Sequence, residues 1–256
     1  MGVGPDEHER PRPRARIVSL RTPERARVGV GPHEHEKMKT AKGGSKIEMV
    51  PSHPKIASTD HDVIDVIRRR WSPRAFDAAR DVVRDDLLRL FEAARWAPSS
   101  GNEQPWRFVV VERSQSSEAF AALMGTLTGR NPAWAGAAPV LVLVAVRATR
   151  EKNQAPNRHA WYDAGQASAF LLLQATAMGL SIRQMEGFDH ERAAEVCRVP
   201  PPFEPAVMMA IGYAGDPESL AVDLHRDAER KPRSRRPVSE FVFGGAWGEP
   251  LGPGLR

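Results

Sequence analysis

The segment APVLVLVAV, residues 138–146, is the longest apolar run in the chain. It has the length of a strand that is buried on both faces, and it is well short of the roughly 20 apolar residues that a membrane-spanning helix needs. Segments with helical and with strand patterns are interspersed on both sides of it, without an internal repeat. The pattern therefore predicts an α+β fold in which helices flank a central sheet.

Hydrophobic spacing predicts the other elements. One helix is expected to begin at Thr59 or Asp60 and to bury the apolar side chains of VIDVI, residues 63–67, on one face. A second helix is expected over 84–97, with Leu88 on its buried face. Further helices are expected around 116–128, over 160–179 and over 189–199, and further strands over 107–112 and 206–214.

The net charge of +5 is concentrated near the N-terminus. Residues 1–50 hold eleven lysines and arginines against seven acidic residues, which leaves a net charge of +1 for the other 206 residues. This region is rich in proline and glycine and has no aromatic residue, so it cannot bury enough apolar surface to offset its ordering entropy. Residues 1–55 are therefore expected to form a disordered basic extension, and residues 56–256 a single domain. The extension is interpreted as a solvated leader or as the result of a start codon placed too early, with contact to nucleic acid or acidic lipid as the alternative.

Cys197, the only cysteine, excludes an intrachain disulfide framework. A chain without such bonds fits a reducing compartment, and a cytoplasmic location is expected. Within the helical pattern AAEVCRV, 193–199, the thiol is interpreted as a packed side chain and not as a nucleophile. The HEHE run at 33–36 is interpreted as part of the polar extension. Because the eight histidines show no ligand spacing, no metal site is predicted.

The loop APSSGNEQPWRF, residues 97–108, holds small polar side chains between two prolines, after a helical pattern and before a strand pattern. Serine, asparagine and glutamine side chains both donate and accept hydrogen bonds, and proline stiffens the backbone that carries them. Such a loop suits a ligand with a row of hydroxyls or with alternating donors and acceptors. The alternative is a polar turn that ends a helix and leads into a strand.

Two arginine-rich turns lie far apart in the sequence, RRRWSPRAF at 68–76 and KPRSRRP at 231–237. The dipole of the preceding helix explains the first arginines of the run, but not Arg74, which lies beyond Pro73. Arginine presents a bidentate fork to phosphate, so convergence of the two turns on one anion is the functional interpretation, and two solvated faces are the alternative. The sequence has neither a G-x-x-x-x-G-K-[ST] loop nor a G-x-G-x-x-G motif, which argues against P-loop NTPases and dinucleotide-binding Rossmann domains.

Four motifs, RWSPRAF, APSSGNEQPWRF, GLSIRQMEGFD and PRSRRP, stand in the same order as in the FMN-dependent nitroreductase family, whose members are NAD(P)H-dependent flavin oxidoreductases. The chain resembles this family over roughly residues 60–249. The resemblance implies a nitroreductase-like α+β fold with a central mixed sheet flanked by helices. It also implies an obligate homodimer with one FMN per subunit at the dimer interface.

Carried over position by position, Arg70, Ser72 and Arg74 correspond to the first flavin-binding turn of the family. The resemblance places Arg70 at the flavin phosphate and Arg74 near the pyrimidine edge of the ring. Arg233 and Arg235 correspond to the basic pair that completes the phosphate site.

The other implied cofactor contacts lie at the flavin ring and at the ribityl chain. Glu186 and Gly187 correspond to the segment that lies against flavin N5, and Asn131 corresponds to a further polar contact. Trp71 stands where several relatives have a smaller or an imidazole side chain. The loop that hydrogen-bonds the ribityl chain and the ring, partly from the neighbouring subunit, corresponds to Pro98, Ser99, Ser100, Asn102 and Gln104.

The resemblance implies that FMN carries the chemistry: it takes a hydride from NAD(P)H at N5 and reduces a nitroaromatic, quinone or related acceptor by a ping-pong mechanism. Arg74 would stabilise the negative charge of the reduced flavin, and no protein nucleophile or general base is expected. Reductive dehalogenases and flavin-modifying enzymes on the same scaffold are the alternatives among enzymes. A non-catalytic FMN-binding protein is the alternative from another class. Neither a membrane nor a nucleic acid is expected as a partner of the domain.

Overall fold

The computed structural model describes residues 55–252. The expected extension and its HEHE run therefore lie outside the described residues, with the exception of Lys55. Lys55 is buried, and its ammonium group donates hydrogen bonds to the main-chain carbonyls of Ala228 and Lys231. Lys55 therefore packs with the domain that was expected to begin one residue later.

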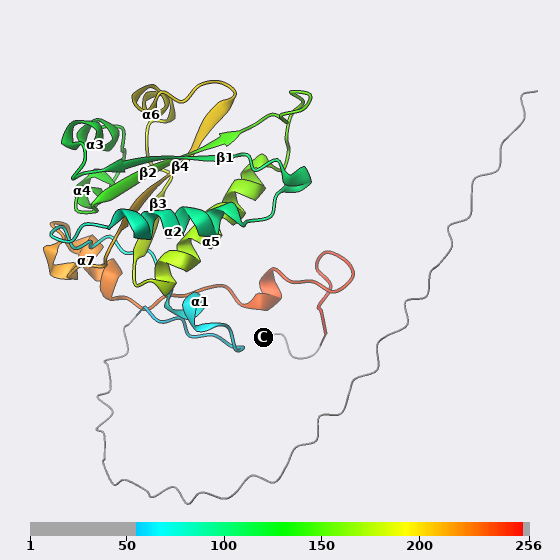
Figure 1. Cartoon of the computed structure of the whole chain (residues 1–256). Coiled ribbons are helices and arrows are strands. Elements are labelled where there is room, and N and C mark those ends of the chain that lie inside the picture. Colours follow the sequence, from blue (N-terminus) through cyan, green and yellow to red (C-terminus); the bar gives the residue numbers. More distant parts are fainter. Residues whose placement is uncertain (1–54, 253–256) are drawn as a thin grey trace, which may run out of the picture. The chain divides into compact units, whose positions relative to one another are not determined.

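A four-stranded sheet in the order β1-β2-β4-β3 forms the centre of the domain (Figure 1). Its strands are β1 (Trp106–Glu112), β2 (Val140–Arg147), β3 (Ser181–Met185) and β4 (Phe203–Gly212). All three pairings in the described part of the chain are antiparallel, whereas the family resemblance implied a mixed sheet. The reason lies in the strand order. β2 and β3 both run antiparallel to β4, which lies between them, so the two parallel strands are not neighbours.

Helices cover both faces of the sheet, which confirms the predicted α+β architecture (Figure 1). On one face lie α2 (Arg84–Arg95) and α5 (Ala160–Ala177). On the other face lie α3 (Ser117–Met124), α4 (Pro132–Ala135) and α6 (His190–Cys197). Within residues 55–252, every helix is too short or too polar to cross a bilayer.

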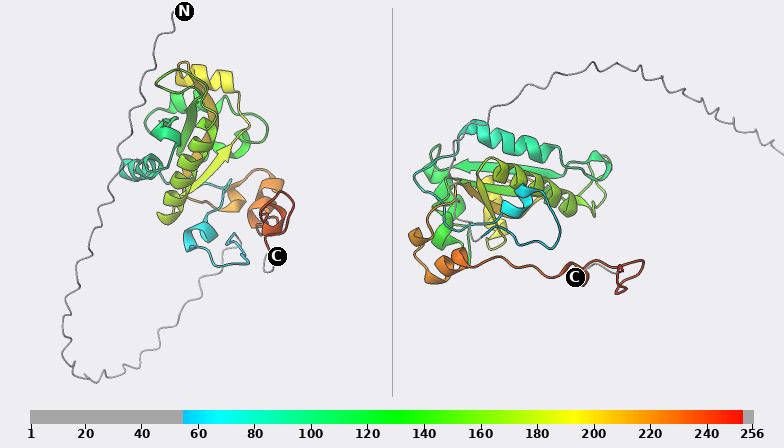
Figure 2. Two further views of the ribbon diagram at one scale, coloured as in Figure 1. Left: turned by 90° about the vertical axis from the view of Figure 1, so that its right-hand side faces the viewer. Right: turned by 90° about the horizontal axis from the view of Figure 1, so that it is seen from below.

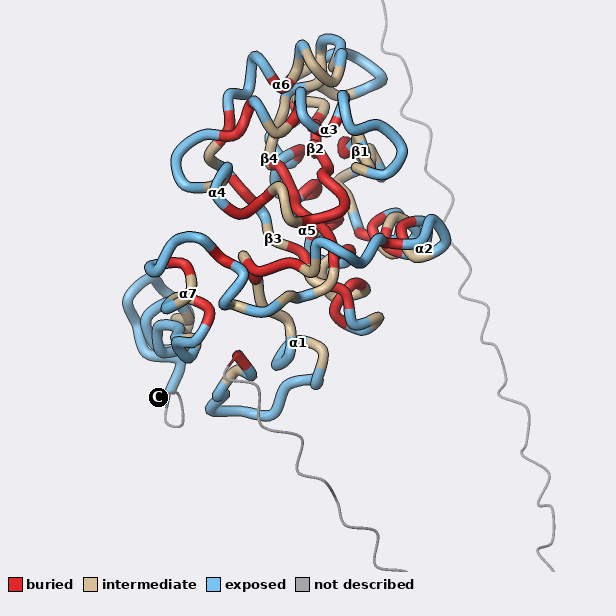
Figure 3. Tube along the Cα trace, turned by 90° about the vertical axis from the view of Figure 1, so that its left-hand side faces the viewer, coloured by how far each residue is buried: buried red, intermediate tan, exposed pale blue. Residues whose placement is uncertain are grey.

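Strand β2 supplies the middle of the core on both sides of the sheet (Figure 3). Val142 and Val144 pack toward α2 and α5, while Leu141 and Leu143 pack toward α3, α4 and α6. Successive side chains of a strand point to opposite faces, so a strand that is covered on both faces is apolar throughout. This arrangement confirms the prediction made from APVLVLVAV.

Two predicted helix faces differ from the structure. The first helix, α1 (Asp65–Arg69), has only five residues and begins after Ile64, not at Thr59 or Asp60. Ile64 is 64% exposed, so the apolar face expected over 63–67 is not buried within this chain. In α2, Leu88 is 56% exposed, and the buried residues are Leu87, Leu90 and Ala94. The apolar faces of α1 and α2 were both expected to be buried in the core. Each is therefore partly exposed and available for contacts outside this chain.

The C-terminal part of the chain contains a helix that the sequence pattern did not predict, α7 (Asp223–Arg230). Its buried residues are His225 and Glu229, so its inward face carries a polar and a charged side chain. Hydrophobic spacing cannot reveal such a helix, because the residues that it buries are not apolar. Short 3-10 turns occur at η1 (Ser100–Asn102), η2 (Pro217–Ser219) and η3 (Val238–Glu240).

Candidate functional site

The two arginine-rich turns lie against each other in the structure, although they are far apart in sequence. Arg233 donates hydrogen bonds to the main-chain carbonyl of Arg70 and, at 2.7 Å, to that of Arg68. Arg70 in turn donates from Nη1 to Ser72 Oγ at 3.0 Å. The two turns are therefore adjacent in the fold, as convergence on one anion requires.

A cavity of about 570 Å³ is lined by Arg70, Arg233 and Arg235, together with residues 57–60 and 236–238. The pKa of Arg70 lies below its ordinary value because the group is buried and because Arg233 and Arg235 are close to it. The pKa of Arg233 is lowered by burial and by Arg235. Its Nε atom is buried without a hydrogen-bond partner among the described residues. Three positively charged guanidinium groups lie close together here, and one of them has a buried N–H donor without a partner among the described residues. Such a group suits the binding of an anion such as a phosphate.

A second group of charged side chains surrounds Arg74. Its main-chain N–H donates to Glu229 Oε1 at 3.1 Å, and its Nη1 lies 3.8 Å from the same oxygen. Arg183 donates to the main-chain carbonyl of Ser72 at 2.6 Å and lies over the ring of Trp134, 5.3 Å from its centroid. The pKa of Arg183 is lowered to about 10, mainly by burial and also by the nearby charge of Arg74, whereas Glu229 has a smaller effect in the opposite direction.

Sequence reasoning did not single out Arg183 or Glu229 as site residues. Arg183 lies inside the motif GLSIRQMEGFD, so its position was available as a signal. No feature of the sequence pointed to Glu229, because it is one of several charged residues in a polar segment. Trp71 lies between these groups in the chain, and the Lys55 ammonium is placed over its ring, 5.5 Å from the centroid.

The predicted residues Asn131 and Gly187 are in direct contact. Asn131 Nδ2 donates to the Gly187 carbonyl at 3.0 Å, and Thr128 N donates to the same oxygen at 2.9 Å. A Cβ atom at position 187 would lie 2.9 Å from Asn131 Nδ2, so only glycine allows this approach. Glu186, the preceding residue, is exposed. This group also lies near the arginine group, because Arg183, which donates to the Ser72 carbonyl, lies over the ring of Trp134, and the Trp134 main-chain N–H donates to the Asn131 carbonyl at 3.2 Å.

The loop at 98–104 is held in an unusual backbone conformation. Gly101, Asn102 and Gln104 all have positive φ angles, of 62°, 57° and 45°. Non-glycine residues adopt this region only where the surroundings hold them there. Gln104 N donates to Ser99 Oγ at 3.1 Å, and the Gln104 side chain donates to the carbonyl and the side-chain oxygen of Asn102, both at 3.1 Å. Pro98 and Asn102 are exposed, which leaves polar groups of the loop available.

A buried carboxylate anchors this loop to the start of α5. Asp163 is 2% exposed and accepts a hydrogen bond from Ser100 N at 3.0 Å. Glu103, in the same loop, accepts from Glu151 N at 3.0 Å. Asp163 could not be recognised from the sequence, because it stands among alanines and aromatic residues in a helical pattern.

The loop and the arginine cavity lie at opposite ends of α5. The loop is tied to the first turn of the helix, whereas α1, which leads into the first arginine turn, lies by the end that continues into β3 (Figures 1 and 2). With 18 residues, α5 is roughly 27 Å long at about 1.5 Å per residue. One copy of the chain therefore groups the arginine, Asn131 and Gly187 positions, but does not bring the 98–104 loop to them.

The nitroreductase family model matches residues 67–213. The chain belongs to the nitroreductase family. This family member is 28% identical over 205 residues to Protein DrgA of Synechocystis, a match that covers 69% of the chain and 90% of the relative. It is 28% identical over 188 residues to YdgI of Bacillus subtilis, which carries the provisional name NAD(P)H nitroreductase, with 61% of the chain and 90% of the relative covered.

Solved structures of the nitroreductase family agree with this assignment. A crystal structure described as an oxidoreductase containing FMN aligns with a TM-score of 0.71 at 31% identity, over 78% of this chain and 100% of that chain. The family and this neighbour support a general oxidoreductase role and flavin binding for the chain.

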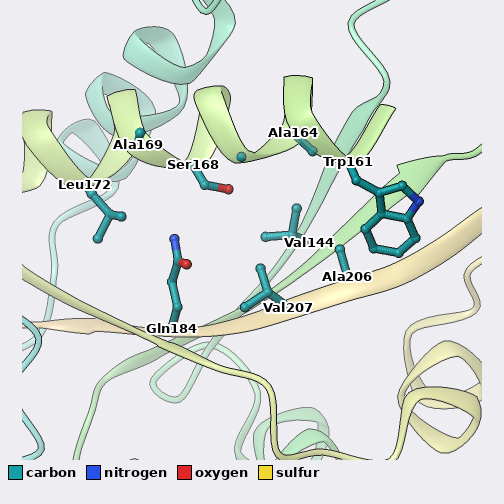
Figure 4. A pocket seen from close by; sticks show the side chains of 10 residues that line it. Val144, Trp161, Ala164, Ser168, Ala169, Leu172, Gln184, Ala206 and Val207 are labelled. Carbon is teal, nitrogen blue, oxygen red and sulfur yellow. The ribbon is translucent and has the colours of Figure 1, made fainter. Parts of the chain in front are cut away.

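The nitroreductase-family chain also has a groove along α5, separate from the arginine cavity (Figure 4). Its volume is about 390 Å³, and it lies between α5 and strands β3 and β4. Small side chains of α5 form one wall, with Trp161 at one end. On the opposite wall Gln184 points from β3 toward the helix. The wall residues from α5 include Ala164, Gly165, Ser168 and Ala169.

Proposed function

We propose that this chain is an NAD(P)H-dependent FMN oxidoreductase that reduces a nitroaromatic, quinone or related acceptor by a ping-pong mechanism. The observation that carries the proposal is the convergence of Arg70, Arg233 and Arg235 on one cavity. Three guanidinium groups with an unused buried donor suit the terminal phosphate of FMN. The proposed FMN-binding domain, which was expected from residue 56 and also includes Lys55, contains the whole family match.

The chain offers a contact for each part of the cofactor. Arg70 and Arg235 would bind the phosphate, and Arg74, held by Glu229, would place a positive charge near the pyrimidine edge of the ring. Glu186 and Gly187 would face N5, with Asn131 fixing the Gly187 carbonyl. FMN supplies hydride acceptance at N5, and these residues bind it, orient it and tune its charge.

A homodimer with shared sites completes the proposal. The 98–104 loop is separated from the arginine cavity by the length of α5, so a second copy has to supply it. Exposed aromatic side chains on α5, with Trp161 at 48%, Tyr162 at 71% and Phe170 at 40%, give apolar surface for that copy. The groove lined by small residues lets a partner element approach α5 closely.

Anaerobic stopped-flow spectroscopy tests the proposal. The purified protein is expected to be yellow, to release FMN on denaturation, and to lose its flavin absorbance when mixed with NADH or NADPH. A second mixing step with a quinone or a nitroaromatic compound should restore the absorbance. Protein that binds FMN but is not bleached by either nucleotide is a non-catalytic FMN-binding protein, and protein that binds no flavin contradicts the whole proposal.

A further inference from the structure

Helix α7 places a buried carboxylate directly against Arg74. Glu229 is 3% exposed, and its Oε1 accepts from the Arg74 main-chain N–H at 3.1 Å while lying 3.8 Å from Arg74 Nη1. One oxygen therefore contacts both the backbone and the charged group of the same residue. The second oxygen, Oε2, is buried without a hydrogen-bond partner among residues 55–252.

The surroundings of Glu229 are strongly basic. Its negative charge raises the pKa of Lys55 and that of Arg183, in both cases against a larger lowering by burial. Arg74 lowers both of these pKa values. The carboxylate thus compensates positive charge at the turn that carries Arg74.

Helix α7 is held at both ends, so Glu229 stands on a fixed element. At its C-terminal end the Lys55 ammonium donates to the carbonyls of Ala228 and Lys231. Nearer its N-terminal end Arg226 donates to the Leu220 carbonyl. Arg230, the last residue of the helix, is paired with Glu218 of the preceding 3-10 turn. A buried carboxylate on an element fixed in this way can determine where its partner lies.

We propose that Glu229 is a positioning residue of the flavin site, which fixes Arg74 and sets how much of its positive charge acts on the bound flavin. The inference rests on the proposed function, because it assumes that flavin binds beside Arg74. A simple buried ion pair would stabilise the fold or would be neutral. One Glu229 oxygen contacts both the main-chain N–H and the guanidinium of Arg74. Glu229 can therefore affect both where Arg74 lies and how much of its positive charge is compensated.

The test is the midpoint potential of the bound FMN in the variant Glu229→Gln. Glutamine keeps an oxygen that accepts from Arg74 N but removes the negative charge. More uncompensated positive charge favours the reduced flavin, which is the more negative form. We expect the ratio of affinities for reduced and oxidised FMN to rise on the order of tenfold, which is about +30 mV for a two-electron couple.

Two further variants separate positioning from structural effects. Asp227→Asn makes the same charge change two residues away, at a side chain that is 61% exposed, and should leave the potential unchanged. In the background Arg74→Gln, the change Glu229→Gln should no longer shift the potential, because the two effects are then not additive. If Glu229→Gln lowers only thermal stability, or if its shift persists without Arg74, the inference is wrong.

The outcomes also distinguish this inference from the proposed function. A native protein that binds no FMN overturns the proposed function and the inference with it. The inference alone is overturned if the native protein binds FMN and is active, but Glu229→Gln has the native midpoint potential. The dissociation constants of the variant for FMN and riboflavin would then also equal those of the native protein.

Discussion

Arg233 donates a hydrogen bond to the main-chain carbonyl of Arg70, 163 residues earlier in the chain. Its second terminal nitrogen is engaged by the Arg68 carbonyl, so this side chain holds the backbone of the first arginine turn. Arg235 instead donates from Nη1 to the neighbouring Ser234 carbonyl. The two arginines that the family resemblance treats as a pair therefore differ in their contacts. Arg233 supports the turn, and Arg235 has more of its guanidinium available for a ligand.

Replacement of Arg235 by alanine should weaken FMN binding specifically. A charge-assisted contact to phosphate contributes about 1.5–3 kcal/mol, which is roughly a 10- to 150-fold rise in Kd. Fluorescence titration of the flavin-free protein measures this change. Riboflavin, which lacks the phosphate, serves as the control ligand, and its Kd should stay the same. Equal losses for both ligands, or no loss for FMN, would contradict the phosphate assignment.

Arg233→Ala should differ from Arg235→Ala in its effect on stability. It leaves the carbonyls of Arg68 and Arg70 without their donors, so the free energy of unfolding should fall by about 1–3 kcal/mol in addition to the loss of FMN affinity. Urea denaturation of the flavin-free variants gives the comparison. Matching stabilities for the two variants would show that Arg233 does not hold the turn.

Replacement of Asp163 by alanine should loosen the 98–104 loop. The change leaves Ser100 N without its acceptor in a partly buried setting, which costs about 1–3 kcal/mol. Asp163→Asn keeps an oxygen that accepts this hydrogen bond and is the matched control, with a smaller expected loss. Unfolding free energies and the rate of proteolysis within residues 98–104 report the effect. A loop that stays protected in Asp163→Ala would mean that its other hydrogen bonds suffice.

The stability of the fold should depend on pH through His225. Both ring nitrogens are buried without partners in the described part of the chain, and burial, followed by Arg74, Arg130 and Arg183, lowers its pKa in the folded state. The unfolded state therefore binds a proton first as the pH falls below the ordinary value of about 6.5. Unfolding free energy should decrease as pH falls through that value. In His225→Gln this decrease should be smaller between pH 7.5 and 5.5, as measured by urea denaturation, and identical slopes would exclude His225 as the cause.

A charge on the groove side of α5 should dissociate the proposed homodimer. Ala169 lines the groove and is exposed in the single chain, so Ala169→Glu should not disturb the folded chain itself. We expect lower dimer content by light scattering together with lower FMN occupancy, because a ligand that contacts both copies stabilises their association. Ala122→Glu, at an exposed position of helix α3 on the other face of the sheet, is the control. A monomeric Ala169→Glu protein with full, tightly held FMN would refute a shared site.

The sequence predicted those parts of the fold whose physical cause is local. Strand β2 was predicted because a strand covered on both faces is apolar throughout. The helix over 160–179 was found as α5 (Ala160–Ala177) because the segment is rich in alanine and ends before Gly179, which has the positive φ angle typical of the residue after a helix. Helix α1 was misjudged, since an apolar spacing alone does not show whether anything in the same chain covers it. Ile64 and Ile67 are both exposed.

The candidate site could be predicted only as a set of positions. The motifs indicated which residues would share a ligand, and the contacts between Arg233 and Arg70 and between Asn131 and Gly187 agree with that grouping. The supporting carboxylates could not be predicted. Asp163 and Glu229 are conspicuous only once burial is known, and burial depends on how distant elements pack.

The close approach of Asn131 to Gly187 also limits how these two positions can change during evolution. A side chain at 187 would meet the amide nitrogen of Asn131 at 2.9 Å, so a residue larger than glycine at 187 requires the Asn131 side chain to move or to be replaced. In homologous sequences, a residue larger than glycine at the position of Gly187 should therefore occur together with a shorter side chain at the position of Asn131. Such paired replacement would be visible as covariation between two columns that are 56 residues apart.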